Sequence, residues 1–516
     1  MMTSAAAASI HAPSIAYAAL MPVLIMLGVA CAGVLVELAP REWRSRIQVP
    51  LAFGGCIAAL IAVIVEHDKR VVTAAGALAI DGPALFIEGT LAILGALSVL
   101  LISERRLDSA GSALVASAAV AVGSDRDRQL STMKREQTEA YPLFSFAMSG
   151  MMLFPSANNL LVMFVALEVL SLPLYLLTGL ARRRRLLSQE AAVKYFLLGA
   201  FASAFFVYGL AMLYGYAGTV SLSGIFSASA GSNKSDTLLL VGFGMLVVGL
   251  LFKASVGPFH TWTPDVYQGA PTAITAFMGA CTKIAAFGAL LRVFYVAFDS
   301  TSWNWRPVMW GVAICSMLIG AIFGLTQTDV KRLLAYSSIA HAGFLVVGVI
   351  ALNKSGVSGT LFYLLTYGIA TIGGFAVVTL VRTSAGEATH LSQWAGLAKR
   401  SPIVAAVFTV LLLSFAGVPL TSGFIAKFVI FKAAVDAGLG PLVVVSLVAS
   451  AIAAFFYLRI VVLMYFSDPP EDGPTVAVPS MATQIVLAFT AAATIFLGIV
   501  PQAILDVADK AAQFVS

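Results

Sequence analysis

Long runs of apolar residues recur along almost the whole chain, and this recurrence limits the possible fold more than any other feature. Each run has about 20 residues, the length that an α-helix needs to cross the hydrocarbon core of a bilayer. About 14 such spans can be placed, at residues 14–38, 49–66, 81–103, 141–157, 159–180, 190–217, 238–257, 271–297, 307–327, 332–352, 358–382, 402–436, 441–466 and 480–504. The sequence therefore predicts an all-α polytopic membrane protein.

The composition excludes several other classes of protein. Of the 516 residues, 60% are hydrophobic and 11% are charged, whereas an ordinary soluble domain has about 25% charged residues. A soluble globule of this size could not bury so much apolar surface, which excludes a cytosolic enzyme, a nucleic-acid-binding protein and a disulfide scaffold. The 4 cysteines lie singly in apolar runs, without the spacing of metal ligands. We expect no cofactor and no metal site in this chain.

The basic residues predict the orientation in the membrane. Lysine and arginine collect in the loops after the first, third and fifth spans, and again at Lys331/Arg332 and Lys399/Arg400. The loop after the fifth span carries four consecutive arginines, Arg182 to Arg185. Because cytoplasmic loops are enriched in Lys and Arg, we expect these loops to be cytoplasmic. An even number of spans then places both termini on the non-cytoplasmic side of the cell (plasma or inner) membrane.

Six ionisable residues lie inside apolar spans, where a charge costs roughly 2.5–3.5 kcal/mol on insertion scales. They are Glu168, Lys194, Lys253, Lys283, His341 and Lys427. Buried carboxyl and amino groups can take up and release protons near neutral pH, so these residues are candidates for a proton path. Two alternatives stay open: Lys194 lies near a helix start and could reach the interface, and His341 could be a hydrogen-bonded core histidine.

Two spans contain helix-breaking residues, Gly257-Pro258 and Gly417-Pro419. Proline removes a backbone donor and clashes with the preceding turn, and interruptions at corresponding positions of two halves are typical of inverted-repeat transporters. Residues 194–206 also align weakly with 363–375. We therefore expect two inverted five-helix repeats (helices 4–8 and 9–13), with helices 7 and 12 discontinuous. The alternative that Gly257-Pro258 is an ordinary helix end near the membrane edge stays open.

The predicted organisation has five parts. They are an N-terminal three-helix segment (1–103), a cytoplasmic insertion (104–140), a first five-helix repeat (141–297), a second five-helix repeat (307–466) and a C-terminal helix (467–516).

Three sequence runs resemble the antiporter-like proton-pumping membrane subunits of respiratory complex I, the NADH-quinone oxidoreductase. They are VGPFHTWTPDVYQGAPTAITAFMGACTKIAAFGALLRV (256–293), QTDVKRLLAYSSIAHAGF (327–344) and GVPLTSGFIAKF (417–428). The resemblance covers most of residues 141–466. It implies 14 helices, two inverted repeats, a central polar axis, and proton-path roles for the six ionisable residues named above.

The resemblance also implies partners and cofactors outside this chain. Flavin, iron–sulfur clusters and quinone are expected in partner subunits, and the partners are other membrane-arm subunits, including further antiporter-like ones. Three features favour one branch of the family. Lys283 stands where the largest member has histidine, Lys427 stands where another member has glutamate, and the chain ends soon after its last span.

The expected function is proton translocation coupled to quinone reduction. A proton would reach Lys253, whose affinity Glu168 sets and Lys194 modulates, and would pass by Lys283 and His341 to Lys427. Two other functions stay open: a subunit of a multi-subunit cation/proton antiporter of the same superfamily, and a non-pumping structural subunit of the membrane arm.

Overall fold

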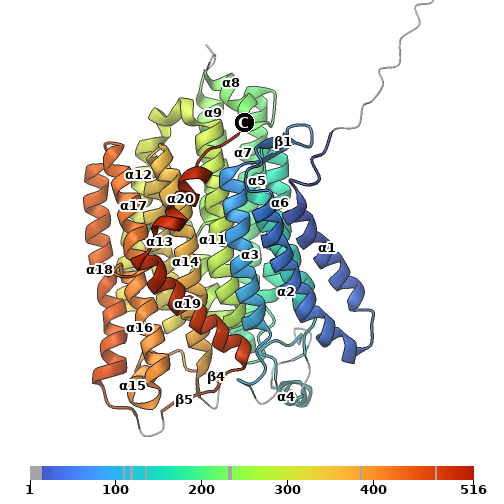
Figure 1. Cartoon of the computed structure of the whole chain (residues 1–516), viewed down its shortest axis with the longest axis vertical. Coiled ribbons are helices and arrows are strands. Elements are labelled where there is room, and N and C mark those ends of the chain that lie inside the picture. The colour runs from blue at the N-terminus through green and yellow to red at the C-terminus, as the bar shows by residue number, and fades with distance from the viewer. Residues whose placement is uncertain are drawn as a thin grey trace, which may run out of the picture.

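The computed structural model describes residues 14–515, apart from 109–110, 117–119, 122, 134–135, 231–234, 384–385 and 471–472. Residues 1–13 of the predicted N-terminal segment and parts of the predicted insertion lie outside this range. The described chain is a bundle of long helices that run between two faces (Figure 1). One face carries α4 (Asp125–Thr132) and α15 (Leu397–Arg400). We call it the basic face, because the loop of Arg182 to Arg185 lies there, packed on the segment that contains α4.

The N-terminal part contributes three helices and a hairpin: α1 (Met21–Val36), α2 (Arg41–Val65), β1 (Val71–Thr73), β2 (Leu78–Ile80) and α3 (Gly82–Ile102). The two strands pair antiparallel, with Val71 opposite Ile80. The Asp81 carboxylate accepts a hydrogen bond from the backbone N–H of Ala84 and so caps α3. It also forms an ion pair with Arg292, in which both side chains are fully buried.

The next part runs from α5 (Ala140–Ser156) and α6 (Leu160–Thr178) to α7 (Arg185–Ala217), α8 (Leu222–Ala230), α9 (Thr237–Lys253), α10 (Trp262–Gly269), α11 (Thr272–Arg292) and a π-helical turn, η1 (Val293–Ala297). Helix α9 ends at Lys253 and helical structure resumes only at Trp262. The interruption contains Gly257 and Pro258, where the sequence predicts a break.

The second large part contains η2 (Asp299–Thr301), α12 (Ser302–Thr326), α13 (Val330–Ile350), α14 (Lys354–Leu380), β3 (Val381–Thr383), β4 (Gly386–Glu387), η3 (Leu391–Trp394), α15, α16 (Pro402–Ala416), α17 (Ser422–Asp436) and α18 (Gly440–Phe466). Helix α16 ends where Gly417 takes the left-handed conformation (φ +82°). Helix α17 begins five residues after that glycine, at Ser422. The chain then forms β5 (Thr475–Val476), which pairs with β3, and the helices α19 (Met481–Ile499) and α20 (Gln502–Ala511).

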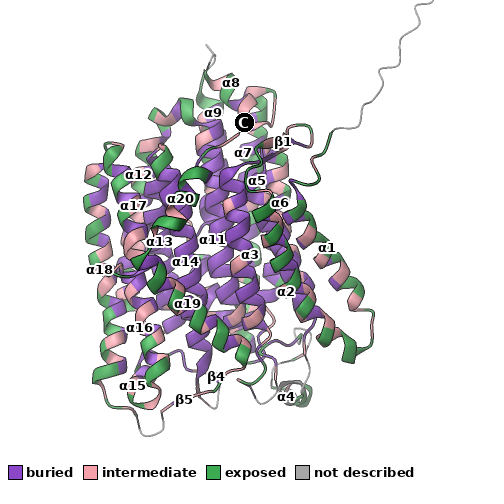
Figure 2. Cartoon of the chain, viewed as in Figure 1, coloured by how far each residue is buried: buried purple, intermediate pink, exposed green. Residues whose placement is uncertain are grey.

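Helices α11, α13 and α14 form the centre of the bundle, and their surfaces are buried almost throughout (Figure 2). They are apolar on all sides, as expected for helices surrounded by other helices. Helices α2, α7 and α18 lie at the periphery and expose apolar side chains along one side. A bundle that is apolar both inside and on its outer surface is suited to a lipid environment.

Among the described residues, ten helices are long and apolar enough to cross a membrane. Three further apolar helices (α1, α9 and α16) are shorter. The chain is therefore a mainly helical, multi-pass membrane protein, as the sequence predicts. The count of about 14 crossings and the five-helix repeats stay predictions.

The predicted insertion packs onto the run of four arginines. The buried Arg182 guanidinium donates hydrogen bonds to the carbonyl oxygens of Ser112 (2.7 Å), Met133 (3.0 Å) and Leu114 (3.4 Å). Arg185 forms an ion pair with Asp127 on α4 and donates to the carbonyl of Val120. Arg182 and Arg185 thus attach the insertion to the bundle, in addition to the orientation that their charge predicts.

Asp108 of the same insertion connects the two large parts of the bundle. Its carboxylate accepts from Arg183, between α6 and α7, at 3.1 and 3.3 Å. It also accepts from Arg382 on β3, after α14, at 3.2 Å. The Asp108 side chain is 4% exposed, whereas the Arg183 side chain is 41% exposed, so the carboxylate is buried and one of its two partners reaches the surface.

Candidate functional site

Lys253 is the last residue of α9, directly before the first helix break, and is 3% exposed. Its ammonium group donates to the hydroxyl of Ser171 on α6 (2.8 Å) and to the hydroxyl of Tyr195 on α7 (3.1 Å). The Nζ atom also lies 5.1 Å from the centroid of the Tyr195 ring, within the range of a cation–π contact. The partners of Lys253 are therefore neutral groups on two neighbouring helices.

Glu168 lies on α6, one turn before Ser171, and accepts a hydrogen bond of 2.5 Å from the Ser203 hydroxyl on α7. It interacts electrostatically with Lys253, but the two side chains form no direct ion pair although both are described. The predicted Glu168–Lys253 connection is therefore indirect in this conformation.

Lys194 contacts different groups from those that the sequence suggests. Its ammonium group pairs with Glu190, one turn earlier on α7 (2.6 Å), and with Asp265 on α10 (2.7 Å). Asp265 in turn pairs with Arg332 on α13 (2.6 Å). The Lys194 side chain is 41% exposed, so it reaches out of the core, which agrees with the alternative of an interfacial lysine.

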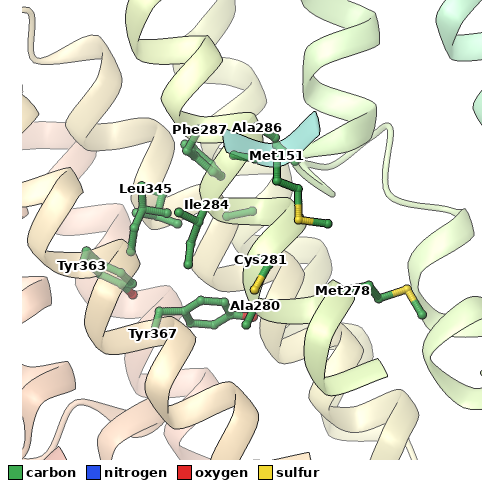
Figure 3. Packing of buried hydrophobic residues seen from close by; sticks show 14 of the residues in the cluster. Met151, Met278, Ala280, Cys281, Ile284, Ala286, Phe287, Leu345, Tyr363 and Tyr367 are labelled. Atoms are coloured by element: carbon green, nitrogen blue, oxygen red, sulfur yellow. The ribbon is translucent and has the colours of Figure 1, made fainter. Parts of the chain in front are cut away.

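Lys283 lies in the middle of α11 and is 1% exposed. Its Nζ atom donates to the backbone carbonyl of Ser338 on α13 at 2.5 Å and lies 5.4 Å from the centroid of the Tyr367 ring. Apolar side chains of the same helix, such as Cys281 and Ile284, pack around this region together with Tyr363 and Tyr367 of α14 (Figure 3). Lys283 is thus a buried cation held by one backbone carbonyl and one aromatic ring.

His341 on α13 is held between two tyrosines. Its Nδ1 atom lies 2.6 Å from the Tyr363 hydroxyl, and its Nε2 atom lies 3.4 Å from the Tyr457 hydroxyl. The Tyr457 hydroxyl also bonds to the Ser337 hydroxyl. The imidazole interacts electrostatically with both Lys283 and Lys427. His341 therefore lies close enough to the central lysine and to the lysine of the second break to interact with both.

Lys427 lies on α17, after the second break, and is 6% exposed. Its ammonium group donates to the carbonyls of Phe415 (2.9 Å) and Ala416 (3.0 Å), the last residues of α16, and to the Ser450 hydroxyl (2.8 Å). The end of a helix is a favourable place for a cation, because carbonyl dipoles point outward there. The break residues Gly417 and Pro419 thus leave free the carbonyls that hold this lysine.

The first break is connected to the other large part of the bundle. The backbone N–H of Gly257 donates to the Ser316 hydroxyl on α12 (3.0 Å), and that hydroxyl donates to the carbonyl of Ile339 on α13 (2.8 Å). The helix break at Pro258 leaves backbone groups without partners inside the helix, and α12 supplies a partner for one of them, the N–H of Gly257. Backbone polar groups in a membrane interior need such partners because no water is available there.

Sequence reasoning missed several polar residues that complete this arrangement. Tyr195, Tyr457 and Asp265 contact Lys253, His341 and Lys194 respectively, but each lies far away along the chain. The two tyrosines give a weak signal in the sequence, because isolated tyrosines in apolar helices usually serve as core residues. Nothing in the sequence near Asp265 indicates its contact with Lys194. Among the described residues, no group of three His, Cys, Asp or Glu side chains is placed to hold a metal ion.

Comparison with known proteins shows the family. A family profile described as NADH:quinone oxidoreductase/Mrp antiporter, TM, matches residues 157–453. NADH-quinone oxidoreductase subunit N of Saccharopolyspora erythraea is 59% identical over 503 residues, covering 96% of this chain and 98% of that protein. The chain belongs to the family of NADH-quinone oxidoreductase subunit N.

Other members of the subunit N family show the same relationship. The subunit N of Mycobacterium bovis is 51% identical over 526 residues, covering 97% of this chain and 99% of that protein. This family is the branch that Lys283 and Lys427 favour in the sequence, so the sequence-based assignment is confirmed.

Solved structures agree with this membership. A chain of respiratory complex I from Thermus thermophilus with bound aureothin is 32% identical, with a TM-score of 0.76, covering 94% of this chain and 99% of that one. A chain of the Mrp complex from Dietzia sp. has a TM-score of 0.80 at 22% identity, covering 96% and 97%. The second likeness shows that the same fold also occurs in an Mrp complex.

Proposed function

We propose that this chain is a proton-translocating membrane subunit of an NADH-quinone oxidoreductase, in which quinone reduction elsewhere in the complex drives proton movement through the bundle. Flavin, iron–sulfur clusters and quinone belong to partner subunits in this proposal. The partners include further antiporter-like subunits. The complex lies in the cell membrane, with the basic face toward the cytoplasm and both termini on the opposite side.

One observation carries the proposal: Lys253, Lys283 and Lys427 are buried in an apolar bundle, and among the described residues each ammonium group donates its hydrogen bonds to neutral oxygen atoms. A lysine in the bilayer interior is costly to keep charged. Because no side chain in the described part of the structure forms a direct ion pair with these three residues, each can lose and regain a proton without breaking an ion pair.

The path proposed runs from Lys253, tuned by Glu168, to Lys283, then by His341 to Lys427. The hydroxyls of Ser171 and Tyr195 accept hydrogen bonds from Lys253 and can orient it in both protonation states. Lys194 acts more distantly, through its contact with Asp265 on α10, the helix that follows the first break. The two helix breaks belong to two inverted five-helix repeats, helices 4–8 and 9–13 of the predicted count.

The test is NADH-driven proton uptake by the assembled complex in sealed vesicles. Lys253→Ala and Glu168→Gln are expected to lower the number of protons translocated per electron pair, while the complex contains normal amounts of this chain. Lys432→Ala on the same helix as Lys427 serves as the control. Unchanged proton translocation in both variants would indicate a non-pumping structural subunit of the membrane arm.

A second function is favoured by the likeness to an Mrp complex, whose fold this chain shares. A subunit of a multi-subunit cation/proton antiporter would use the same buried lysines. Co-purification of this chain with subunits that hold flavin and iron–sulfur clusters supports the first function. Sodium/proton exchange in vesicles that lack those subunits would support the second.

A further inference from the structure

A small polar cavity of about 50 Å³ lies at the basic face, where the two large parts of the bundle meet. Its walls are the turn between α10 and α11 (residues 268–271), the arginine loop after α6, the start of α13 and the β3–β4 hairpin. Lys331 and Glu387 face it from the second part of the bundle, and Asp108 faces it from the insertion. A cavity needs roughly 10–15 Å³ per water molecule, so a few waters fit here.

Lys331 is a charged group of this cavity that the proposed function leaves unused, and its ammonium group is bonded only to a backbone carbonyl among the described residues. Its place in the sequence indicates a loop cation, yet the residue is 2% exposed. Its Nζ atom donates to the backbone carbonyl of Ala270 at 2.7 Å. It is the second residue of α13, and the first turn of a helix is unfavourable for a fixed positive charge. The start of α13 therefore does not stabilise the charged form of the Lys331 side chain.

The other charged side chains at the cavity are bound to partners. Arg183 and Arg382 both pair with Asp108. Arg184 donates to the Thr389 hydroxyl and to the carbonyl of Glu387. The Glu387 carboxylate accepts a hydrogen bond from Thr272 at the start of α11. These contacts leave the Lys331 amine as the group that can exchange a proton with water in the cavity.

A column of polar groups leads from Lys331 to the central Lys283. Ser338 is seven residues further along α13, on the same side of the helix and about 10.5 Å deeper in the bundle. Its backbone carbonyl is the acceptor of Lys283. Its buried hydroxyl lies beside the hydroxyls of Tyr267 and Tyr367, but makes no hydrogen bond of normal geometry. Thr371 on α14 is a second buried hydroxyl without a partner among the described residues.

We infer that this cavity is a proton-uptake site and that Lys331 passes protons from it, along Ser338 and its neighbouring hydroxyls, to Lys283. The inference rests on the proposed function and adds an uptake point at the junction of the two parts, separate from Lys253. The Lys331 ammonium releases one proton into the column and the Lys283 amine gains one. Lys331 is then reprotonated by water in the cavity, so no oxidant, reductant or other reactant is needed.

The sharpest test compares Lys331→Arg with Lys331→Ala in the assembled complex in sealed vesicles. Arginine keeps the positive charge but cannot be deprotonated in a protein. A structural lysine would therefore be replaced well by arginine, whereas a proton carrier would not. Lys354→Ala is the matched control, since Lys354 also lies in the first turn of its helix, α14, but is exposed.

We expect both Lys331 variants to assemble and to translocate fewer protons per electron pair than the unaltered complex. Lys354→Ala should match the unaltered complex. Ser338→Ala should lower the rate of proton uptake without changing the amount of this chain in the complex. Full proton translocation by Lys331→Arg would overturn the inference, as would rescue by arginine of a defect seen with alanine.

The Lys253→Ala variant separates this inference from the proposed function. If Lys253→Ala loses proton translocation and Lys331→Arg does not, the uptake route through Lys331 is wrong and the proposed function stands. If neither Lys253→Ala nor Lys331→Arg changes translocation, both are wrong.

Discussion

The Nδ1 atom of His341 and the hydroxyl oxygen of Tyr363 lie 2.6 Å apart in the core of the bundle. Tyr363 is the residue that the weak internal alignment places opposite Lys194, although the two side chains lie in different surroundings. The hydroxyl fixes the orientation of the imidazole ring, whose other nitrogen faces Tyr457. A histidine held in this way can receive a proton on one side and deliver it on the other.

Tyr363→Phe should slow proton translocation while leaving the fold intact. A hydrogen bond contributes about 0.5–1.5 kcal/mol, so we expect a roughly two- to tenfold lower rate of proton uptake per complex. The measurement is the initial rate of NADH-driven acidification of sealed vesicles. Tyr465→Phe on α18, where the tyrosine is 38% exposed, is the control. If Tyr363→Phe and Tyr465→Phe acidify the vesicles at the same rate, His341 has only a structural role in the core.

Gly417→Ala should disturb Lys427 directly. A Cβ atom at this position would lie 3.0 Å from Cδ and 3.1 Å from Nζ of Lys427, and the backbone φ of +82° costs a non-glycine residue roughly 1–2 kcal/mol. We expect lower stability together with lower proton translocation. Gly438→Ala is the matched control, because its φ is +77° and nothing lies within 4 Å of the added Cβ. Equal loss of translocation in both variants would point to backbone strain alone.

Asp265→Asn should affect the contact between α7, α10 and α13. The carboxylate holds Lys194 and Arg332 at 2.7 and 2.6 Å, and all three groups are partly exposed, which weakens each pair. We therefore expect a modest fall in the rate of proton translocation and normal assembly. The fall should be larger at low ionic strength, where the native pairs are strongest. A rate that does not depend on salt in either protein would contradict an electrostatic role.

Arg182→Ala should release the insertion from the bundle. Three carbonyl oxygens would lose their donor, and an unsatisfied buried polar group costs about 1–3 kcal/mol. We expect a protease added on the basic face to cleave within residues 104–140 faster in this variant. Arg128→Ala on α4, where the side chain is 77% exposed, should leave the cleavage rate unchanged. Equal protection of Arg182→Ala and the unaltered chain would rule out this anchoring role.

Glu104→Gln should change how stability depends on pH. Burial opposes the charged form of Glu104, but hydrogen bonds from Thr483, from the backbone N–H of Arg106 and from Ser480 outweigh it, so the pKa lies below its ordinary value of 4.5. The stabilisation by the carboxylate is present above pH 4.5 and is lost as the pH falls through the lowered pKa. Thermal unfolding of the complex should show a destabilised variant at neutral pH, with the difference shrinking below pH 4.5. A difference that grows on acidification would contradict this sign.

Much of the arrangement could be predicted because lipid imposes strong rules on a sequence. Apolar runs indicate helices, and Gly257-Pro258 and Gly417-Pro419 mark the interruptions of helical structure that the backbone shows. The buried positions of Lys253, Lys283 and Lys427 follow from their places in those runs.

The side-chain contacts between different helices could not be predicted in this way. Lys194 binds Asp265, which lies 71 residues further along the chain, and the choice of this partner depends on how α7 packs against α10. Lys331 has the sequence signature of a loop cation, but the adjacent Arg332 turns toward Asp265 while Lys331 turns into the bundle. The residue at which α13 begins, Val330, decides whether Lys331 or Arg332 points into the bundle. The apolar pattern of the sequence locates this helix start only to within a few residues.

The double ion pair of Asp108 has a mechanical consequence. One carboxylate fastens Arg183 and Arg382, and therefore the two large parts of the bundle, at the basic face. This connection restrains movement of one part against the other at the basic face. A single residue of the predicted insertion thus limits how far two separate parts of the chain can move apart at this face.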